Sequence, residues 1–277
     1  IREVNVSPSK PVILDLALTE TANKLDEVVI ESSPFEILPE SPVSVREISA
    51  TEILRNPGSN RDISNVVRSL PGVASSVSFR NDLIVRGGAP NENRFYLDGI
   101  EVPNINHFAT QGSSGGPVGM INVNFIRDVN FYAGAFPVNR GNALSSVMEF
   151  KQISGNDERL SGSFMVGSSD IGLTLEGPTG ENSAFIFSAR RSYLQFLFQA
   201  LKLPFLPTYN DFQYKHDFNI NEKNRITVIG LGAIDDFALN QNVNNGVTDP
   251  EVIERNNYIL GNLPVNTQWN YAGGVKW

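Results

Sequence analysis

Three segments of this sequence decide its fold: Ser69-Leu-Pro-Gly72, Leu83-Ile-Val-Arg-Gly-Gly88 and Phe95-Tyr-Leu-Asp-Gly99. The proline and glycine of the first segment cannot continue a helix, so a helix that precedes them must end there. The second and third segments have strand composition, and the Asp-Gly pair is typical of a tight turn. Apolar residues before this stop recur at the spacing of one helical face: Ile63, Val66, Val67 and Leu70. The predicted order is helix, strand, glycine corner, strand and turn.

This ordered combination closely resembles the plug domain of TonB-dependent outer-membrane receptors. In that family a helix ending in Leu-Pro-Gly-Val precedes an Ile-Arg-Gly-Gly strand and a Leu-Asp-Gly turn. The matching residues here are Leu70-Pro-Gly-Val73, Ile84-Val-Arg-Gly-Gly88 and Leu97-Asp-Gly99. The resemblance implies a plugged barrel of about twenty-two strands. We therefore expect this chain to be a fragment of a longer protein.

The composition excludes several classes of protein. The 277 residues carry a formal net charge of -8, which argues against a nucleic-acid partner because phosphate backbones are bound by clustered lysine and arginine. The sequence has no cysteine, so disulfides, cysteine-ligated zinc and thiol catalysis are excluded. The longest apolar stretch, 194–206, is interrupted by polar residues and falls well below the ~20 residues of a membrane helix. Any membrane insertion must therefore use strands.

Residues 1–39 are predicted to contain two parts. Residues 1–22 alternate like the end of a small β domain, and the resemblance implies the carboxypeptidase-regulatory-like domain of SusC-like receptors. Residues 23–39 hold a short apolar strand followed by a proline-rich linker. The alternative for this strand is that it closes the preceding domain. The resemblance implies instead that it is the TonB box, which a partner grips by β-augmentation and which consists of Asp26, Glu27, Val28, Val29 and Ile30.

Residues 40–153 are predicted to form a compact α+β domain, which the resemblance identifies as the plug. Ser49 and Glu52 have the spacing of a capping box, which indicates a brief helix through Leu54. A second helix is predicted at 60–70. Strand-like runs accompany these helices at 82–86, 94–98, 125–132 and 145–151.

Residues 154–277 have a different sequence pattern, in which apolar and polar residues alternate repeatedly. About six strands of roughly ten residues are predicted, separated in part by long loops at 194–211 and 237–266. In the clearest strand, polar residues alternate with Phe212 and Tyr214. This pattern indicates antiparallel transmembrane β-barrel strands that form an incomplete barrel in this chain. The alternative is a soluble antiparallel sandwich, which also alternates.

Charged residues lie within the predicted plug strands, where a buried charge needs a partner. We predict a charge-paired network that includes Arg86 and Asp98 and holds the domain folded or against the inner barrel wall. The alternative is an exposed sheet face. The motif and network residues are Arg80, Arg86, Gly87, Gly88, Asp98 and Gly99.

The long loop at 103–119 is the predicted substrate-binding segment, on the outer side of the molecule. Its amide, imidazole and phenyl groups suit hydrogen bonding to, and stacking on, a polar ligand such as a glycan, a peptide or a siderophore. The alternative is a glycine-rich connector whose polar groups face water. The candidate residues are Asn104, Asn106, His107, Phe108 and Gln111.

One pattern associated with hydrolases occurs, because 112–116 reads G-x-S-x-G and His107 is nearby. A nucleophile elbow needs a helix after it, whereas Pro117 follows here, so we interpret the segment as a flexible loop. A soluble hydrolase using Ser114 and His107 is the alternative. The histidines lack metal-ligand spacing, and Asp235-Asp236 is interpreted as a solvated loop, with a calcium site as the alternative. We expect no enzyme activity, no metal and no cofactor.

The resemblance implies active import of a nutrient across the bacterial outer membrane, with the plug and the N-terminus facing the periplasm. The C-terminal domain of TonB would pull on 25–30 and shift the plug, because the outer membrane has no energy supply of its own. The expected partners are TonB, outer-membrane lipid and a glycan, peptide or metal–siderophore nutrient, without nucleic acid. The alternative is a plugged barrel that acts as a signalling receptor or as a scaffold for a surface lipoprotein complex with a lipoprotein lid.

Overall fold

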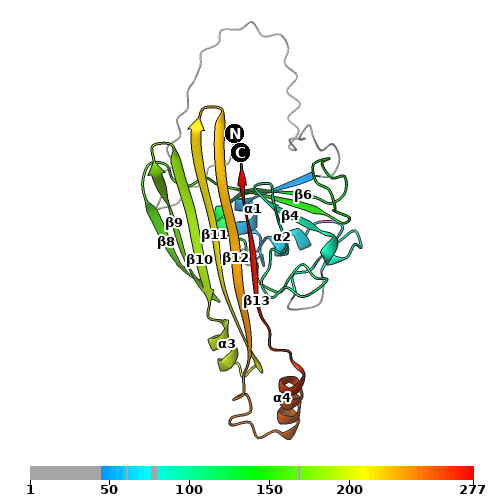
Figure 1. Ribbon diagram of the computed structural model, residues 1–277. Helices are drawn as coiled ribbons and strands as arrows, with labels where there is room; N and C mark the ends of the chain where they lie inside the picture. The colour runs from blue at the N-terminus through cyan, green and yellow to red at the C-terminus, as the bar shows by residue number, and fades with distance from the viewer. Residues whose placement is uncertain (1–44, 60–61, 76–79, 168) are drawn as a thin grey trace.

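The computed structural model describes four stretches of the chain: residues 45–59, 62–75, 80–167 and 169–277. The predictions for residues 1–22 and for the TonB box at 26–30 lie outside these stretches. The described residues form an α+β domain and a six-stranded sheet, and the domain packs against one face of the sheet (Figure 1).

The α+β domain consists of short elements in the order β1 Val45–Ser49, α1 Ala50–Arg55, α2 Ile63–Arg68, β2 Val73–Ser75, β3 Leu83–Val85, η1 Pro90–Glu92, β4 Arg94–Leu97, β5 Ile100–Val102, η2 Val123–Phe125, β6 Ile126–Tyr132 and β7 Val147–Gln152. Five strands make one sheet in the order β1-β6-β7-β4-β5, and β2 pairs with β3. The pair of β4 and β7 is parallel, and the other pairs are antiparallel.

Local signals in the sequence place several of these elements. Ser49 caps α1 and Asp62 caps α2, each by accepting a backbone N–H of the first helical turn. Gly72 follows α2 with a φ of 81°, a conformation that glycine adopts without strain. Asp98 and Gly99 have φ values of 48° and 94°, and they form the two-residue turn between β4 and β5.

The C-terminal part of the chain forms six antiparallel strands: β8 Ser161–Val166, β9 Asp170–Gly180, β10 Ser183–Ser192, β11 Phe205–Asn221, β12 Asn224–Leu239 and β13 Thr267–Lys276. Each strand pairs with its neighbour in the sequence, and β8 and β13 are the two edges. The two long connections contain α3 Leu194–Ala200 and α4 Pro250–Asn262 and lie at the same end of the sheet (Figure 1). The predicted fold class is confirmed, because an α+β domain precedes antiparallel strands that form one open sheet and not the two packed sheets of a sandwich.

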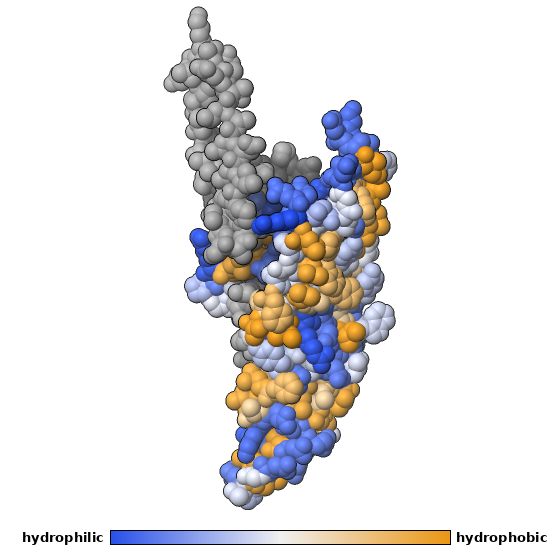
Figure 2. All heavy atoms as spheres, turned by 90° about the vertical axis from the view of Figure 1, so that its left-hand side faces the viewer, coloured by the Kyte–Doolittle hydropathy of each residue, from blue (hydrophilic) through white to orange (hydrophobic). Residues whose placement is uncertain are grey.

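The six-stranded sheet has two different faces. In β11, Asp211 and Gln213 are buried against the α+β domain, whereas Phe212 between them is exposed on the other face. That outer face carries large exposed apolar side chains, among them Phe164, Val166, Ile220, Ile234, Trp269 and Val275. Figure 2 shows the side on which β8 and β9 lie, where hydrophobic side chains gather between hydrophilic tips. Among the described residues, no helix combines the length and apolar character needed to cross a membrane.

One large apolar cluster holds the α+β domain together. It includes Val66 of α2 and Phe150 of β7, neither of which is more than 1% exposed. The strand β12 of the six-stranded sheet adds Ile229, Leu231 and Ala233 to the same cluster. A small apolar patch of the sheet therefore packs directly against the core of the domain.

Several predicted boundaries in the C-terminal half are wrong. The loop predicted at 194–211 contains α3 and the start of β11, and the loop predicted at 237–266 contains α4. The strands extend beyond the residues that alternate clearly, because backbone pairing continues where the outward side chains are no longer apolar. Asp235 consequently lies within β12 and is buried, which corrects its interpretation as part of a solvated loop.

Candidate functional site

The loop at 103–119 lies between β5 and η2 of the α+β domain and contacts the inner face of the sheet. Its own packing is tight. A Cβ atom on Gly115 would lie 2.4 Å from the Cβ of Asn106. A Cβ atom on Gly116 would lie 2.5 Å from the carbonyl oxygen of His107. Only glycine permits such close approach, so the glycine-rich segment lets the loop fold back behind His107.

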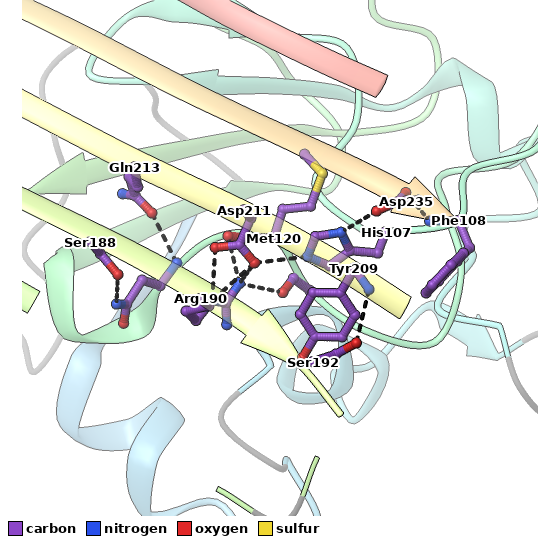
Figure 3. Close-up of polar contacts among 12 residues, drawn as sticks. His107, Phe108, Met120, Ser188, Arg190, Ser192, Tyr209, Asp211, Gln213 and Asp235 are labelled. Atoms are coloured by element: carbon purple, nitrogen blue, oxygen red, sulfur yellow. Dashed lines mark hydrogen bonds and ion pairs between the residues drawn. The ribbon is translucent and has the colours of Figure 1, made fainter. Parts of the chain in front are cut away.

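His107 is completely buried against the inner face of the sheet, where it contacts β11 and β12 (Figure 3). Its Nε2 lies 2.9 Å from Oδ2 of Asp211 on β11, and its Nδ1 lies 2.7 Å from Oδ1 of Asp235 on β12. Its ring stacks on Tyr209, with ring centroids 4.1 Å apart. Arg190 on β10 also contacts Asp211, at 2.9 Å. We call His107, Arg190, Asp211 and Asp235 the histidine cluster.

The geometry of the histidine cluster favours a protonated His107. Ionised carboxylates only accept hydrogen bonds, so a histidine that donates to both Asp211 and Asp235 must carry a proton on each ring nitrogen. Burial lowers the pKa of His107, but hydrogen bonds to the two carboxylates and their charges outweigh burial, so the pKa is raised above its ordinary value. With Arg190, the cluster then holds two cations and two carboxylates, and its charges balance.

The same carboxylates fix both sides of the loop. Asp235 Oδ2 accepts the backbone N–H of Phe108 at 2.6 Å, and Phe108 has a φ of 55°, which is unusual for a bulky residue. Arg190, held by Asp211, donates from Nη2 to the carbonyl oxygens of Gly119 and Met120 at 2.9 and 2.8 Å. The sheet therefore holds the loop at two places, Phe108 and the end of the loop at Gly119 and Met120.

A second polar contact lies further along β11. Lys215 forms an ion pair with Asp98 at 2.9 Å and donates to the carbonyl of Gln152 at 3.2 Å. Asp98 also accepts the backbone and side-chain N–H groups of Gln152. We call Asp98, Gln152 and Lys215 the lysine cluster. It joins the turn after β4 and the end of β7 to the sheet.

Neutral groups connect the two clusters. The side chain of Asn122 donates to Ser188 Oγ at 2.9 Å, and its backbone N–H donates to Gln213 Oε1 at 2.9 Å. Gln213 in turn donates to Gln152 at 2.8 Å. A line of polar contacts thus follows β10 and β11 from the histidine cluster to the lysine cluster.

The structure separates the residues that the sequence groups as one network. Asp98 belongs to the lysine cluster, whereas Arg86 is exposed, makes no ion pair with Asp98 and lies with Gly87 in the turn after β3. Arg80 pairs with Asp82 at 2.6 Å. The glycines have backbone roles: positive φ at Gly87 and Gly99, and at Gly88 a position where a Cβ atom would lie 2.5 Å from Ser145 Oγ.

The loop candidates also have different surroundings. Asn106 and His107 are buried and satisfied, since Asn106 donates to the Ser114 carbonyl at 2.9 Å and His107 lies in its cluster. Gln111 is exposed, and Asn104 lines a small hollow beside β12 and β13. Phe108 is partly buried and lines a larger cavity at the α3 and α4 end of the sheet.

The arrangement does not form a serine–histidine pair. Ser114 Oγ accepts the backbone N–H of Leu83 at 3.0 Å, and both ring nitrogens of His107 are occupied by carboxylates. No helix follows Ser114 among the described residues before the short η2, so the elbow geometry is absent there. Within the described part of the chain, no group of three or more histidine, aspartate or glutamate residues is arranged to hold a metal ion.

Sequence reasoning missed the sheet residues of this site: Arg190, Asp211, Lys215 and Asp235. Their signal is nevertheless present, because Asp211, Gln213 and Lys215 occupy the polar parity of β11. Successive side chains of a strand point to opposite faces of the sheet, so a charged residue that alternates with apolar outer residues points inward. There it must meet a partner of opposite charge or water. The sequence does not show which loop of the domain supplies that partner.

The family model of the TonB-dependent receptor plug domain matches residues 38–147. A ferric enterobactin receptor from Pseudomonas aeruginosa (PfeA), solved as a variant in complex with enterobactin, is 17% identical with a TM-score of 0.55 over 85% of this chain and 38% of that chain. The siderophore receptor PirA from Acinetobacter baumannii is 14% identical with a TM-score of 0.56 over 84% of this chain and 37% of that chain. Comparison with curated proteins gives no match.

At these identities the solved structures support the fold alone, and the chain spans less than two fifths of the length of either receptor. The order of elements is the same as the sequence predicts, a plug followed by antiparallel strands. The finer assignment to the SusC-like subgroup stays a prediction. The chain therefore carries a TonB-dependent receptor plug domain, matched at residues 38–147, and six strands of an open antiparallel sheet follow it.

Proposed function

We propose that this chain provides the plug and part of the wall of an active importer in the bacterial outer membrane. The nutrient is a glycan, a peptide or a metal–siderophore complex, and TonB drives its passage by pulling on residues 25–30. The siderophore receptors named above support an import role. The exposed apolar outer face of the sheet supports insertion in lipid by strands.

One observation carries the proposal: ion pairs and hydrogen bonds on the inner face attach the plug to the sheet. Charged and polar groups lose little when water replaces their partners, whereas exposed apolar surface has no such replacement. The histidine and lysine clusters therefore hold the plug in a position from which a pull can release it. The apolar patch on β12 adds to this attachment.

The proposed orientation places α3, α4 and the 103–119 loop on the outer side, where a ligand arrives. The plug and the N-terminus then face the periplasm, where TonB can reach the 25–30 strand. An extended strand with free backbone groups is a suitable handle, because a partner can add to its edge without a preformed pocket.

The test is binding of the C-terminal domain of TonB to a peptide of residues 20–40 and to the whole receptor. Val28→Pro removes a backbone donor from the strand, and we expect it to abolish binding in both. Val28→Ala keeps that donor and is the matched control, which should bind like the unchanged chain. Absence of binding in both contexts, or equal binding by the proline variant, would contradict TonB-driven import and favour the scaffold alternative.

A further inference from the structure

An apolar cavity lies between the plug loop and the sheet, next to the histidine cluster. Its volume is about 380 Å³, within the usual range for small-molecule sites. The plug contributes one wall, and the ends of β11 and β12 with α3 contribute the other. We call it the aromatic pocket; its apolar lining includes Phe108, Leu194, Phe198, Phe205, Phe237 and Leu263.

The phenylalanine rings in this pocket form a connected set. Phe205 stacks on Phe237 with centroids 5.5 Å apart, and Phe198 meets Phe205 edge to face at 5.4 Å. Phe108 approaches Phe237 edge to face at 6.4 Å from the plug side. These four rings come from the plug, a long connection and two strands, so only the assembled molecule brings them together.

The backbone of Phe108 is strained in a way that keeps this ring in the pocket wall. Its φ of 55° lies in a region that is uncommon and energetically unfavourable for a bulky residue. The carboxylate of Asp235 holds the conformation by accepting the Phe108 N–H at 2.6 Å. Such strain in a wall of a cavity is typical of binding sites.

The two buried polar candidates of the loop already have partners within the protein. Asn106 and His107 are buried and bonded within the protein. At the rim of the pocket, Arg80 pairs with Asp82, and Gln268 donates to Asp235 at 3.0 Å. A glycan placed in this cavity would leave buried hydroxyl groups without partners, which is costly.

We propose that the aromatic pocket binds an aromatic ring carried by the imported compound. Edge-to-face and offset contacts with the four phenylalanines favour a planar ring, and the lining offers little to a sugar. That the bound compound is an import substrate rests on the function proposed above, whereas ring binding itself needs neither TonB nor transport. The expected ligand is therefore a nutrient with an aromatic part, not any polar nutrient.

The experiment uses the whole purified receptor and two probes, 4-fluorobenzoate and maltotriose, with binding followed by ligand-observed NMR. We expect saturable binding of 4-fluorobenzoate and none of maltotriose. Phe237→Ala and Phe198→Ala should each weaken 4-fluorobenzoate binding roughly tenfold through lost ring contact. Phe198 lies on α3 in a long connection, so its replacement leaves the sheet intact. The matched control is Phe164→Ala, which removes an exposed ring from the outer face.

Each other outcome contradicts the proposal. Maltotriose binding without 4-fluorobenzoate binding would identify a polar site, and non-saturable uptake of 4-fluorobenzoate would identify partition into detergent or lipid only. Unchanged affinity in both pocket variants would place the probe elsewhere. TonB binding, measured with Val28→Pro in the same receptor, separates failure of this proposal from failure of the import function.

Discussion

The interior of the plug and its contact with the sheet are stabilised by different kinds of interaction. Inside the plug, apolar side chains such as Phe150 and Val129 are excluded from water almost completely. At the sheet, the histidine cluster, the lysine cluster and the amides between them supply ion pairs and hydrogen bonds beside one apolar patch on β12. The shape of the plug and its position therefore depend on separate interactions. A variant can therefore alter one and leave the other nearly unchanged.

The largest effect is expected inside the plug. Phe150→Ala removes a side chain that is 1% exposed in the middle of β7, and it should destabilise the plug by about 3–5 kcal/mol through lost burial and the cavity left behind. Proteolysis of the plug in increasing urea measures this change. Val138→Ala, at a fully exposed position, is the control and should have little effect. Equal resistance of the two variants would show that the apolar cluster does not determine plug stability.

Removal of His107 should release the plug from the sheet without unfolding it. His107→Leu takes a donor away from each of Asp211 and Asp235, and the expected cost is about 1–3 kcal/mol because both carboxylates stay buried. Hydrogen exchange of residues 103–119 measures the release, since the Phe108 N–H is protected by Asp235. Exchange in the β6–β7 core should be unchanged. Faster exchange in that core as well would mean that position and shape are not separable.

The attachment should also depend on pH in a defined direction. The pKa of His107 is raised above its ordinary value of 6.5, so its contribution to stability is complete below that value. The contribution is lost as the pH rises through the raised pKa. Protease protection of the 103–119 loop, followed across this range, should fall with rising pH.

Two variants serve as controls for the pH experiment. His107→Asn should abolish the pH dependence, because the titrating group is gone. His216→Ala should preserve it, because His216 lies on the outer face of β11, next to Phe218. A pH dependence that survives in the asparagine variant would assign it to another group.

The smallest effect is expected at the lysine cluster. Lys215→Met removes the ion pair with Asp98, but Asp98 keeps two hydrogen bonds from Gln152, so the cost should be about 1 kcal/mol. Hydrogen exchange at the turn after β4 measures it. The control, Lys223→Met, changes an exposed residue in a turn. A larger effect than that of His107→Leu would reverse the ranking of the two clusters.

Much of the fold could be predicted, because its signals are local. The helix stop at Pro71-Gly72, the turn at Asp98-Gly99 and the alternation in β11 each follow from the conformational limits of a few neighbouring residues. The helices α3 and α4 were not predicted. The seven residues of α3 leave only a weak periodic pattern, whereas α4 has 13 residues and begins with a start signal, Asp249-Pro250, that the loop interpretation overlooked.

The site was only partly predictable, because its contacts join residues far apart in the sequence. His107 meets Asp211 and Asp235 across more than one hundred residues. Nothing near Asp235-Asp236 in the sequence indicates that its first carboxylate is buried. The prediction that His107 contacts a ligand followed from its residue type, whereas its position is fixed by two strands that no local pattern connects to it.

The carboxylate of Asp235 makes hydrogen bonds with Nδ1 of His107, through Oδ1, and with the backbone N–H of Phe108, through Oδ2. Two neighbouring residues, one anchoring the plug and one lining the aromatic pocket, therefore share a single acceptor. Thermodynamic linkage makes such an arrangement reciprocal: a compound that binds more tightly to the seated plug stabilises the seated plug by the same factor. Ligand affinity therefore depends on whether the plug is attached, and plug attachment depends on whether the ligand is bound. The same coupling free energy can be measured from the change in ligand affinity or from the change in plug attachment.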